Sequence, residues 1–241
     1  MTARGLCWWL VPSCVVAFLI AGLTYIATAL TWIGPAPPTF AIDQDLDAYL
    51  DAYLTFRRET MAAEQIANVA VVVGSLLLGV LLVIAPRIGA LRNDLAGRVG
   101  GLLAFTGSVV YAATQLAYLG AIAEVLTTSA IPDFDARNLG TWTQVIDRTD
   151  DYVENLGLVL LAVALLLLRT PSNDRHTVRW RAAALILSAG LIILVAASFA
   201  RAEPLTDVML ALSSIVLVPV CAIILGARIR MAEGHPLRVD Q

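Results

Sequence analysis

The chain has 241 residues, of which 59% are hydrophobic and 15% charged, and its mean hydropathy is +0.80. A soluble domain carries roughly 25% charged residues, so this composition argues against a soluble globular protein and indicates an integral membrane protein. The formal net charge is −3, and all 16 basic residues are arginine. The absence of lysine and the abundance of Ala, Leu and Val indicate a GC-rich bacterial source.

Six apolar stretches reach or approach the length that crosses a bilayer, which is about 20 residues. The predicted spans are residues 6–33, 66–85, 99–126, 152–168, 182–200 and 208–227. The fourth is apolar only from Leu156 to Leu168, and it spans if residues 152–155 enter the interface. Pro219 is expected to kink the sixth. We therefore predict an all-α, polytopic integral membrane protein: a single domain over residues 1–241 containing a six-transmembrane-helix bundle.

The first stretch also resembles a secretory signal peptide. Arg4 precedes it, and the small residues Ala27 and Ala29 lie where a signal peptidase could cut. Its apolar part is about twice the usual 7–15 residues, which favours a helix that is retained. Cleavage stays open as the alternative.

The arginines are distributed unequally between alternate connecting segments. Eleven arginines and four acids fall on one side of the predicted spans, and five arginines and fifteen acids fall on the other. Cytoplasmic loops near helix ends are enriched in Lys and Arg. We therefore predict a plasma (inner) membrane protein with both termini in the cytoplasm and an acidic face outside.

Two outer segments, residues 34–65 and 127–151, are long enough to form an extracytoplasmic helical cap. Prolines at 35, 37 and 38 end the first helix, whereas residues 42–64 lack Gly and Pro and predict a helix that continues into the second span. Residues 142–155 likewise predict a helix that leads into the fourth span.

An aspartate string, Asp43, Asp45 and Asp47, invites a calcium interpretation. An EF-hand loop also requires Gly and Glu at two later positions, where this chain has Ala48 and Leu54. We interpret the string as an acidic helix start, which suits the helix dipole. No metal site is predicted.

Ionisable residues inside spans are functional candidates, because burying them in lipid costs several kcal/mol or forces them to pair. Here they lie near the outer ends of the helices. If their faces converge, they build an outward-facing cleft between the second, third and fourth helices, where carboxylates oppose arginines. The candidate cleft residues are Arg57, Glu64, Asn68, Gln115, Glu124, Arg148, Glu154, Asn155 and Arg201. Alternatively, they are interfacial residues satisfied by water, headgroups and one another.

A stripe of small residues recurs every four positions along the third span: Gly100, Ala104, Ser108 and Ala112. Small residues allow a second helix to approach closely. The stripe predicts either a central position for this helix in the bundle or a homodimer contact.

Motifs that would indicate an enzyme are missing. The chain contains no H-E-x-x-H, P-loop, C-x-x-C or G-x-S-x-G pattern, so we expect no catalytic residue and no cofactor. The leading hypothesis is a non-catalytic interaction or accessory subunit that uses its outer acidic face. The alternative is a small-solute or lipid transporter with an outward-facing polar cleft. Expected partners are the lipid bilayer and a membrane protein or a second copy of the chain, and no nucleic acid.

Overall fold

The computed structural model describes residues 3–35, 38, 46–91, 94–128, 136–169 and 175–234. Within these ranges the chain is helical, with turns and no strand, which confirms the all-α prediction. The helices are α1 (Ala3–Ala29), α2 (Leu46–Arg87), α3 (Leu95–Thr128), α4 (Ala136–Leu167), α5 (Arg175–Phe199), α6 (Glu203–Leu212), the π-helix η1 (Ser213–Leu217) and α7 (Val218–Gly234).

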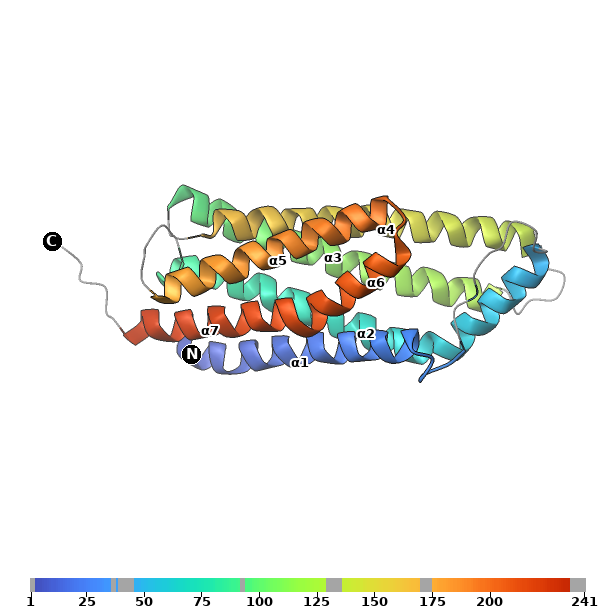
Figure 1. Cartoon of the computed structure of the whole chain (residues 1–241), viewed down its shortest axis with the longest axis horizontal. Coiled ribbons are helices and arrows are strands. Elements are labelled where there is room, and N and C mark those ends of the chain that lie inside the picture. The colour runs from blue at the N-terminus through green and yellow to red at the C-terminus, as the bar shows by residue number, and fades with distance from the viewer. Residues whose placement is uncertain are drawn as a thin grey trace.

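The long helices lie side by side in an elongated bundle and alternate in direction along the chain (Figure 1). Each of α1 to α5 packs against the next helix in sequence. The helices form a closed ring, because α5 packs on both α6 and α7, and α7 packs on α1. The N-terminus of α1 and the C-terminus of α7 therefore lie at the same end of the bundle (Figure 1).

Within the described part of the chain, five segments are long and apolar enough to cross a membrane, and they correspond to the predicted first, second, third, fifth and sixth spans. They are Trp8–Ala29, Asp51–Arg87, Leu95–Thr128, Thr177–Phe199 and Leu205–Ala232. The predicted fourth span lies in α4, which is apolar only near its C-terminal end. The chain is thus an all-helical protein with five to six long apolar helices, compatible with a membrane helical bundle.

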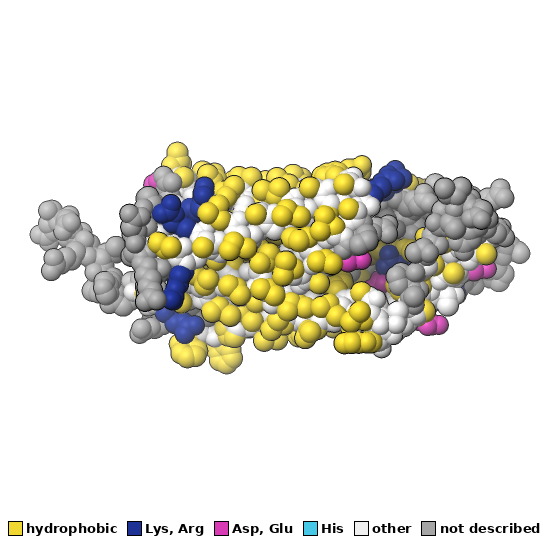
Figure 2. Space-filling model, viewed as in Figure 1, with side chains coloured by type: hydrophobic (Ala, Val, Ile, Leu, Met, Phe, Trp, Pro, Cys, Tyr) yellow, Lys and Arg dark blue, Asp and Glu magenta, His cyan; other side chains and the backbone are white. Residues whose placement is uncertain are grey.

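The outer surface of the bundle agrees with a membrane location. Figure 2 shows hydrophobic side chains across the middle of the visible face, with arginines gathered at the end where the termini lie. Leu102, Ile186 and Ile223 are more than half exposed on this surface, at 65%, 57% and 52%. Such a large apolar surface requires a cover, which a bilayer would provide.

Several helices extend beyond the predicted spans. From Leu46 onward, α2 joins the predicted outer helix and the second span without a break. In the same way α4 begins at Ala136 and includes the helix predicted for residues 142–155. Asp43 and Asp45 lie outside the described residues, as do residues 129–135.

The predicted sixth span contains a π-helical turn in place of a continuous α-helix. In η1 the backbone N–H of Val218 donates to the carbonyl of Ser213, five residues earlier. Pro219, where a kink was expected, follows directly and has no N–H to donate. The widened turn therefore lies immediately before the proline.

The two ends of the bundle differ in chemistry. The arginine end carries Arg87, Arg98, Arg179 and Arg228, at or near the adjacent termini of α2, α3, α5 and α7. There Trp180 is fully buried and its indole N–H donates to the carbonyl of Leu168 at 3.2 Å. Arg228 donates from Nε to the carbonyl of Ala90 at 2.8 Å and from Nη1 to Thr177 Oγ1 at 2.7 Å. We call the opposite end the acidic end.

Close backbone contact joins α3 to α4 midway between these ends. A Cβ atom added to Gly107 would lie 2.7 Å from the Gly157 carbonyl oxygen, and one added to Gly157 would lie 2.9 Å from that of Gly107. The predicted small-residue stripe is buried within the bundle: Gly100 faces α4, and Ser108 faces Gly79 of α2. Small residues therefore give α3 its place between α2 and α4.

Candidate polar cleft at the acidic end

A cleft of about 880 Å³ opens at the acidic end among α1, α2, α3, α4 and α6. It is lined by five of the residues predicted from the sequence: Arg57, Glu64, Asn68, Gln115 and Glu154. The structure adds the first and sixth spans to a cleft that was expected between the second, third and fourth helices.

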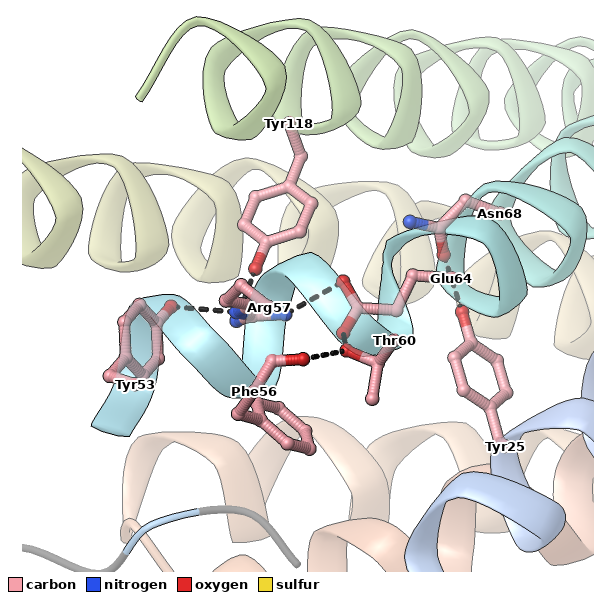
Figure 3. Close-up of polar contacts among 8 residues, drawn as sticks. All are labelled: Tyr25, Tyr53, Phe56, Arg57, Thr60, Glu64, Asn68 and Tyr118. Carbon is pink, nitrogen blue, oxygen red and sulfur yellow. Dashed lines mark hydrogen bonds and ion pairs between the residues drawn. The ribbon is translucent and has the colours of Figure 1, made fainter. Parts of the chain in front are cut away.

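Arg57 is held in the cleft wall by three side chains (Figure 3). Its guanidinium donates to the Tyr53 hydroxyl at 2.8 Å, to Glu64 Oε2 at 2.8 Å and to the Tyr118 hydroxyl at 2.6 Å. The guanidinium carbon also lies 5.0 Å from the ring centroid of Tyr53 and 5.8 Å from that of Tyr118. Because Tyr118 belongs to α3, the arginine ties α2 to α3.

The local cause of this arrangement is the spacing along α2. Tyr53, Arg57, Thr60 and Glu64 follow one another at intervals of three or four residues, which places them on one face of the helix. Thr60 is completely buried, and its Oγ1 lies 2.9 Å from the Phe56 carbonyl and 2.8 Å from Glu64 Oε1. Glu64 is therefore fixed from both sides, by Arg57 and by Thr60.

Two further contacts connect neighbouring helices across the cleft. The Tyr25 hydroxyl of α1 donates to Asn68 Oδ1 of α2 at 2.7 Å (Figure 3). On the other side, Glu154 of α4 accepts hydrogen bonds from Gln115 Nε2 at 3.0 Å and from Tyr111. Both donors to Glu154 lie on α3, so this carboxylate is oriented by the helix opposite its own.

The lining of the cleft carries an excess of negative charge. Among the described lining residues, the charged groups are the carboxylates of Glu64, Asp150, Glu154 and Asp207 and the guanidinium of Arg57, which is ion-paired with Glu64 at 2.8 Å. The aromatic rings that line the cleft are those of Tyr25, Phe56, Tyr111 and Tyr118. Carboxylates attract cations directly, and the faces of aromatic rings attract them through the ring quadrupole.

The other predicted site residues lie elsewhere. Glu124 and Arg148 are exposed and do not line the cleft. Arg201 is exposed in the turn between α5 and α6, where its φ is 53°. Asn155 is buried, and its Nδ2 donates to Ser198 Oγ of α5 at 3.1 Å. Of the arginines expected to oppose carboxylates, Arg57 alone lines the cleft.

Sequence reasoning did not assign Tyr25, Phe56 or Asp207 to the site. Tyr25 lies inside the first apolar stretch, and its position near the acidic end was its one signal. Asp207 lies near the start of the sixth span. Placing either in the cleft requires knowing that the helix ring closes between α1 and α6, which no local pattern indicates.

A smaller cavity of about 40 Å³ lies in the bundle centre and has Tyr111 and Leu210 in common with the cleft lining. Its wall includes four serines: Ser75, Ser108, Ser213 and Ser214. The hydroxyl oxygens of Ser108 and Ser213 are buried and have no hydrogen-bond partner. The cavity is large enough for a few water molecules.

The chain matches no protein-family model, no curated protein and no solved structure. Among the described residues, no group of three or more His, Cys, Asp or Glu side chains could hold a metal ion. The function is therefore argued from the chemistry of the cleft itself.

Proposed function

We propose that this chain is a six-span inner-membrane protein that binds a small organic cation in its outward-facing cleft and carries it across the membrane. The observation that supports the proposal most directly is the excess of carboxylates over guanidinium groups in a cleft that is also lined with aromatic rings. An amine or quaternary ammonium ion is attracted both by carboxylates and by the faces of aromatic rings. The cleft volume of about 880 Å³ lies in the range of about 300–1,000 Å³ that is typical of small-molecule sites.

Six spans require α4 to cross the membrane, and its surroundings support this. It packs between α3 and α5, both of which are long and apolar enough to span. Leu156, Val159 and Val163 of α4 are 53%, 40% and 41% exposed, as lipid-facing residues would be. With an even number of spans both termini lie on one side, and the arginine end indicates the cytoplasm for that side.

Within the cleft, Glu154 is the proposed counter-charge for the ligand. Its two hydrogen-bond donors are uncharged, whereas Glu64 is already paired with Arg57. A cation that enters the cleft therefore meets a carboxylate that is oriented but not neutralised by a side-chain cation. We assign Arg57 and Glu64 a positioning role, because their ion pair holds the cleft wall in place.

The test is equilibrium binding to the purified full-length protein in nanodiscs, measured by calorimetry. Tetramethylammonium and choline serve as cationic probes, and tert-butanol and acetate as neutral and anionic probes of similar size. We expect the cations alone to bind. Glu154→Gln should weaken their binding by about tenfold or more, which corresponds to about 1.4 kcal/mol.

Glu124→Gln is the matched control, since Glu124 is an exposed carboxylate outside the cleft. It should bind the cations as the wild type does, and proteoliposomes should take up the bound cation with this variant but not with Glu154→Gln. Equal binding of cationic and neutral probes, or equal loss in the two variants, would overturn the proposal.

A second candidate is the accessory-subunit function, which one observation favours. An apolar groove of about 530 Å³ lies between α3 and α4 near the acidic end, and Trp142, 63% exposed, forms part of it. A partner helix would cover this surface. Replacing Trp142 with Ala and Val145 with Ser should abolish co-purification of a partner from native membranes. Unchanged co-purification would count against this function.

A further inference from the structure

A separate groove of about 690 Å³ lies between α2 and α3 at the arginine end of the bundle. We propose that it binds an anionic phospholipid, with the phosphate between Arg87 and Arg98 and one acyl chain along the groove. The inference is independent of the cation cleft, because the two sites have no lining residue in common.

The groove forms where glycines of α3 face a proline near the end of α2. On α3, Gly97 and Gly101 have no side chains to fill the space between the helices. On α2, Pro86 has no N–H to donate to the Leu82 carbonyl, and a Cβ atom added to Gly101 would lie 3.4 Å from that carbonyl oxygen. The two backbones therefore come close at this point and leave an open channel beside it.

The walls of the channel face the lipid. Leu102 and Phe105 line it and are 65% and 40% exposed. From Arg98 to Phe105 the channel follows α3 for seven residues, or about 10 Å at the helical rise of about 1.5 Å per residue. A free phosphate would leave this apolar wall uncovered, whereas an acyl chain would cover it.

The mouth of the channel carries positive charge. Arg87 ends α2, Arg98 lies in the first turn of α3, and both are exposed. The nearby acid, Asp94, accepts a hydrogen bond from the Gly97 N–H at 3.0 Å and so caps the start of α3. Two guanidinium groups against one capping carboxylate leave a net positive mouth. Guanidinium groups bind phosphate oxygens in a two-pronged geometry.

The chemistry selects a negatively charged headgroup on that side of the membrane. Basic pockets between transmembrane helices on the cytoplasmic side bind anionic lipid headgroups. A zwitterionic lipid offers the same phosphate, but its ammonium group would repel the two arginines. We therefore expect phosphatidylglycerol to bind more tightly than phosphatidylcholine.

The experiment is native mass spectrometry of the delipidated full-length protein titrated with phosphatidylglycerol or phosphatidylcholine. The wild type should retain phosphatidylglycerol, and the Arg87→Gln/Arg98→Gln double variant should bind it about tenfold more weakly or worse. Arg179→Gln is the matched control, because Arg179 is an exposed arginine at the same end but outside the groove. It should bind the lipid as the wild type does.

Three outcomes would overturn the proposal. The first is equal binding to the wild type and the double variant, and the second is an equal loss in Arg179→Gln, which would indicate attraction to the whole arginine end. The third is displacement of the lipid by millimolar inorganic phosphate, which would identify a free-phosphate site. If the double variant does not fold, the single variants Arg87→Gln and Arg98→Gln replace it. Each should lose part of the phosphatidylglycerol binding.

Discussion

The arginine end and the acidic end of the bundle are held together in different ways. At the arginine end, Leu82, Leu165, Trp180 and Leu225 are completely buried and fill the space between helices, and the hydrogen bonds of Trp180 and Arg228 add to this packing. At the acidic end, hydrogen bonds and one ion pair connect helices around an open cleft. The difference shows how one bundle can combine a tightly packed half with an accessible half.

The interior of a bilayer would favour both close packing and hydrogen bonds between helices. Lipid tails are as apolar as leucine, so association of helices inside the bilayer depends on close packing and on hydrogen bonds between helices. Where the helices pack tightly, as around Leu82 and Leu165, close contact can suffice. Where they separate to form the cleft, directional bonds such as that from Tyr25 to Asn68 fix the distance between them.

The close α3–α4 contact between the two ends should be the most sensitive point of the molecule. In Gly107→Ala, the new methyl group would lie 2.7 Å from the Gly157 carbonyl, so the helices must move apart. Overpacking of this kind costs about 1–3 kcal/mol. We expect a loss of that size in the free energy of unfolding, measured by denaturant titration in mixed micelles.

Gly120→Ala is the control for this substitution. It lies in the same helix, and apart from its neighbours in the chain and the adjacent backbone of that helix, no described atom lies within 4 Å of the position where its Cβ would be. Replacing an interior helical glycine by alanine there should stabilise the protein by about 0.5–1 kcal/mol. If both variants change stability in the same direction and by the same amount, α3 and α4 do not depend on close packing at Gly107.

The Arg57 cluster should be the next most sensitive point, and it tests whether polar bonds hold the acidic end. Arg57→Ala removes three side-chain hydrogen bonds and leaves Glu64 without its cation. Because the two side chains are 17% and 16% exposed, solvent reduces the cost below that of a fully buried pair. We expect a loss of about 1–2 kcal/mol in the free energy of unfolding.

Arg148→Ala serves as the control, since Arg148 is an exposed arginine of the same end that does not line the cleft. It should change stability by less than about 0.5 kcal/mol. Adding Glu64→Gln to Arg57→Ala should restore part of the loss, because the uncompensated carboxylate is removed. No difference between Arg57→Ala and Arg148→Ala would mean that the bonds of Arg57 do not stabilise the acidic end.

The sequence predicted the helices of this fold better than it predicted the cleft. Apolar runs identified the long apolar helices, because the composition that suits lipid contact extends along a whole helix. Glu64 and Asn68 were also predicted correctly as cleft residues, and their four-residue spacing keeps them on one face of α2. Glu154 and Asn155 show the limit of this approach. Successive residues point about 100° apart on a helix, so one faces the cleft and the other faces α5.

The remaining information lies in how the helices are arranged around the ring. Tyr25 reaches Asn68 because α1 packs on α2, and Asp207 reaches the same cleft because α6 packs on α1. Periodicity within a helix specifies which face is polar, but it does not specify which other helix that face meets. Arg148, on the same helix as Glu154, looked equally suitable in the sequence and lies exposed outside the cleft.

The smallest expected effect concerns the serines between the two halves. The hydroxyl of Ser213 is buried with no hydrogen-bond partner among the described residues, whereas that of Ser188, which is also buried, donates to the Ala162 carbonyl at 3.1 Å. Ser188→Ala should cost about 0.5–1.5 kcal/mol, and Ser213→Ala should cost nothing or stabilise, because it removes an unsatisfied polar group. Unfolding titrations of the two variants measure the difference. A loss in Ser213→Ala as large as that in Ser188→Ala would mean that water bonds to the Ser213 hydroxyl, and the hydrated region of the acidic end would then extend past Tyr111 to the centre of the bundle.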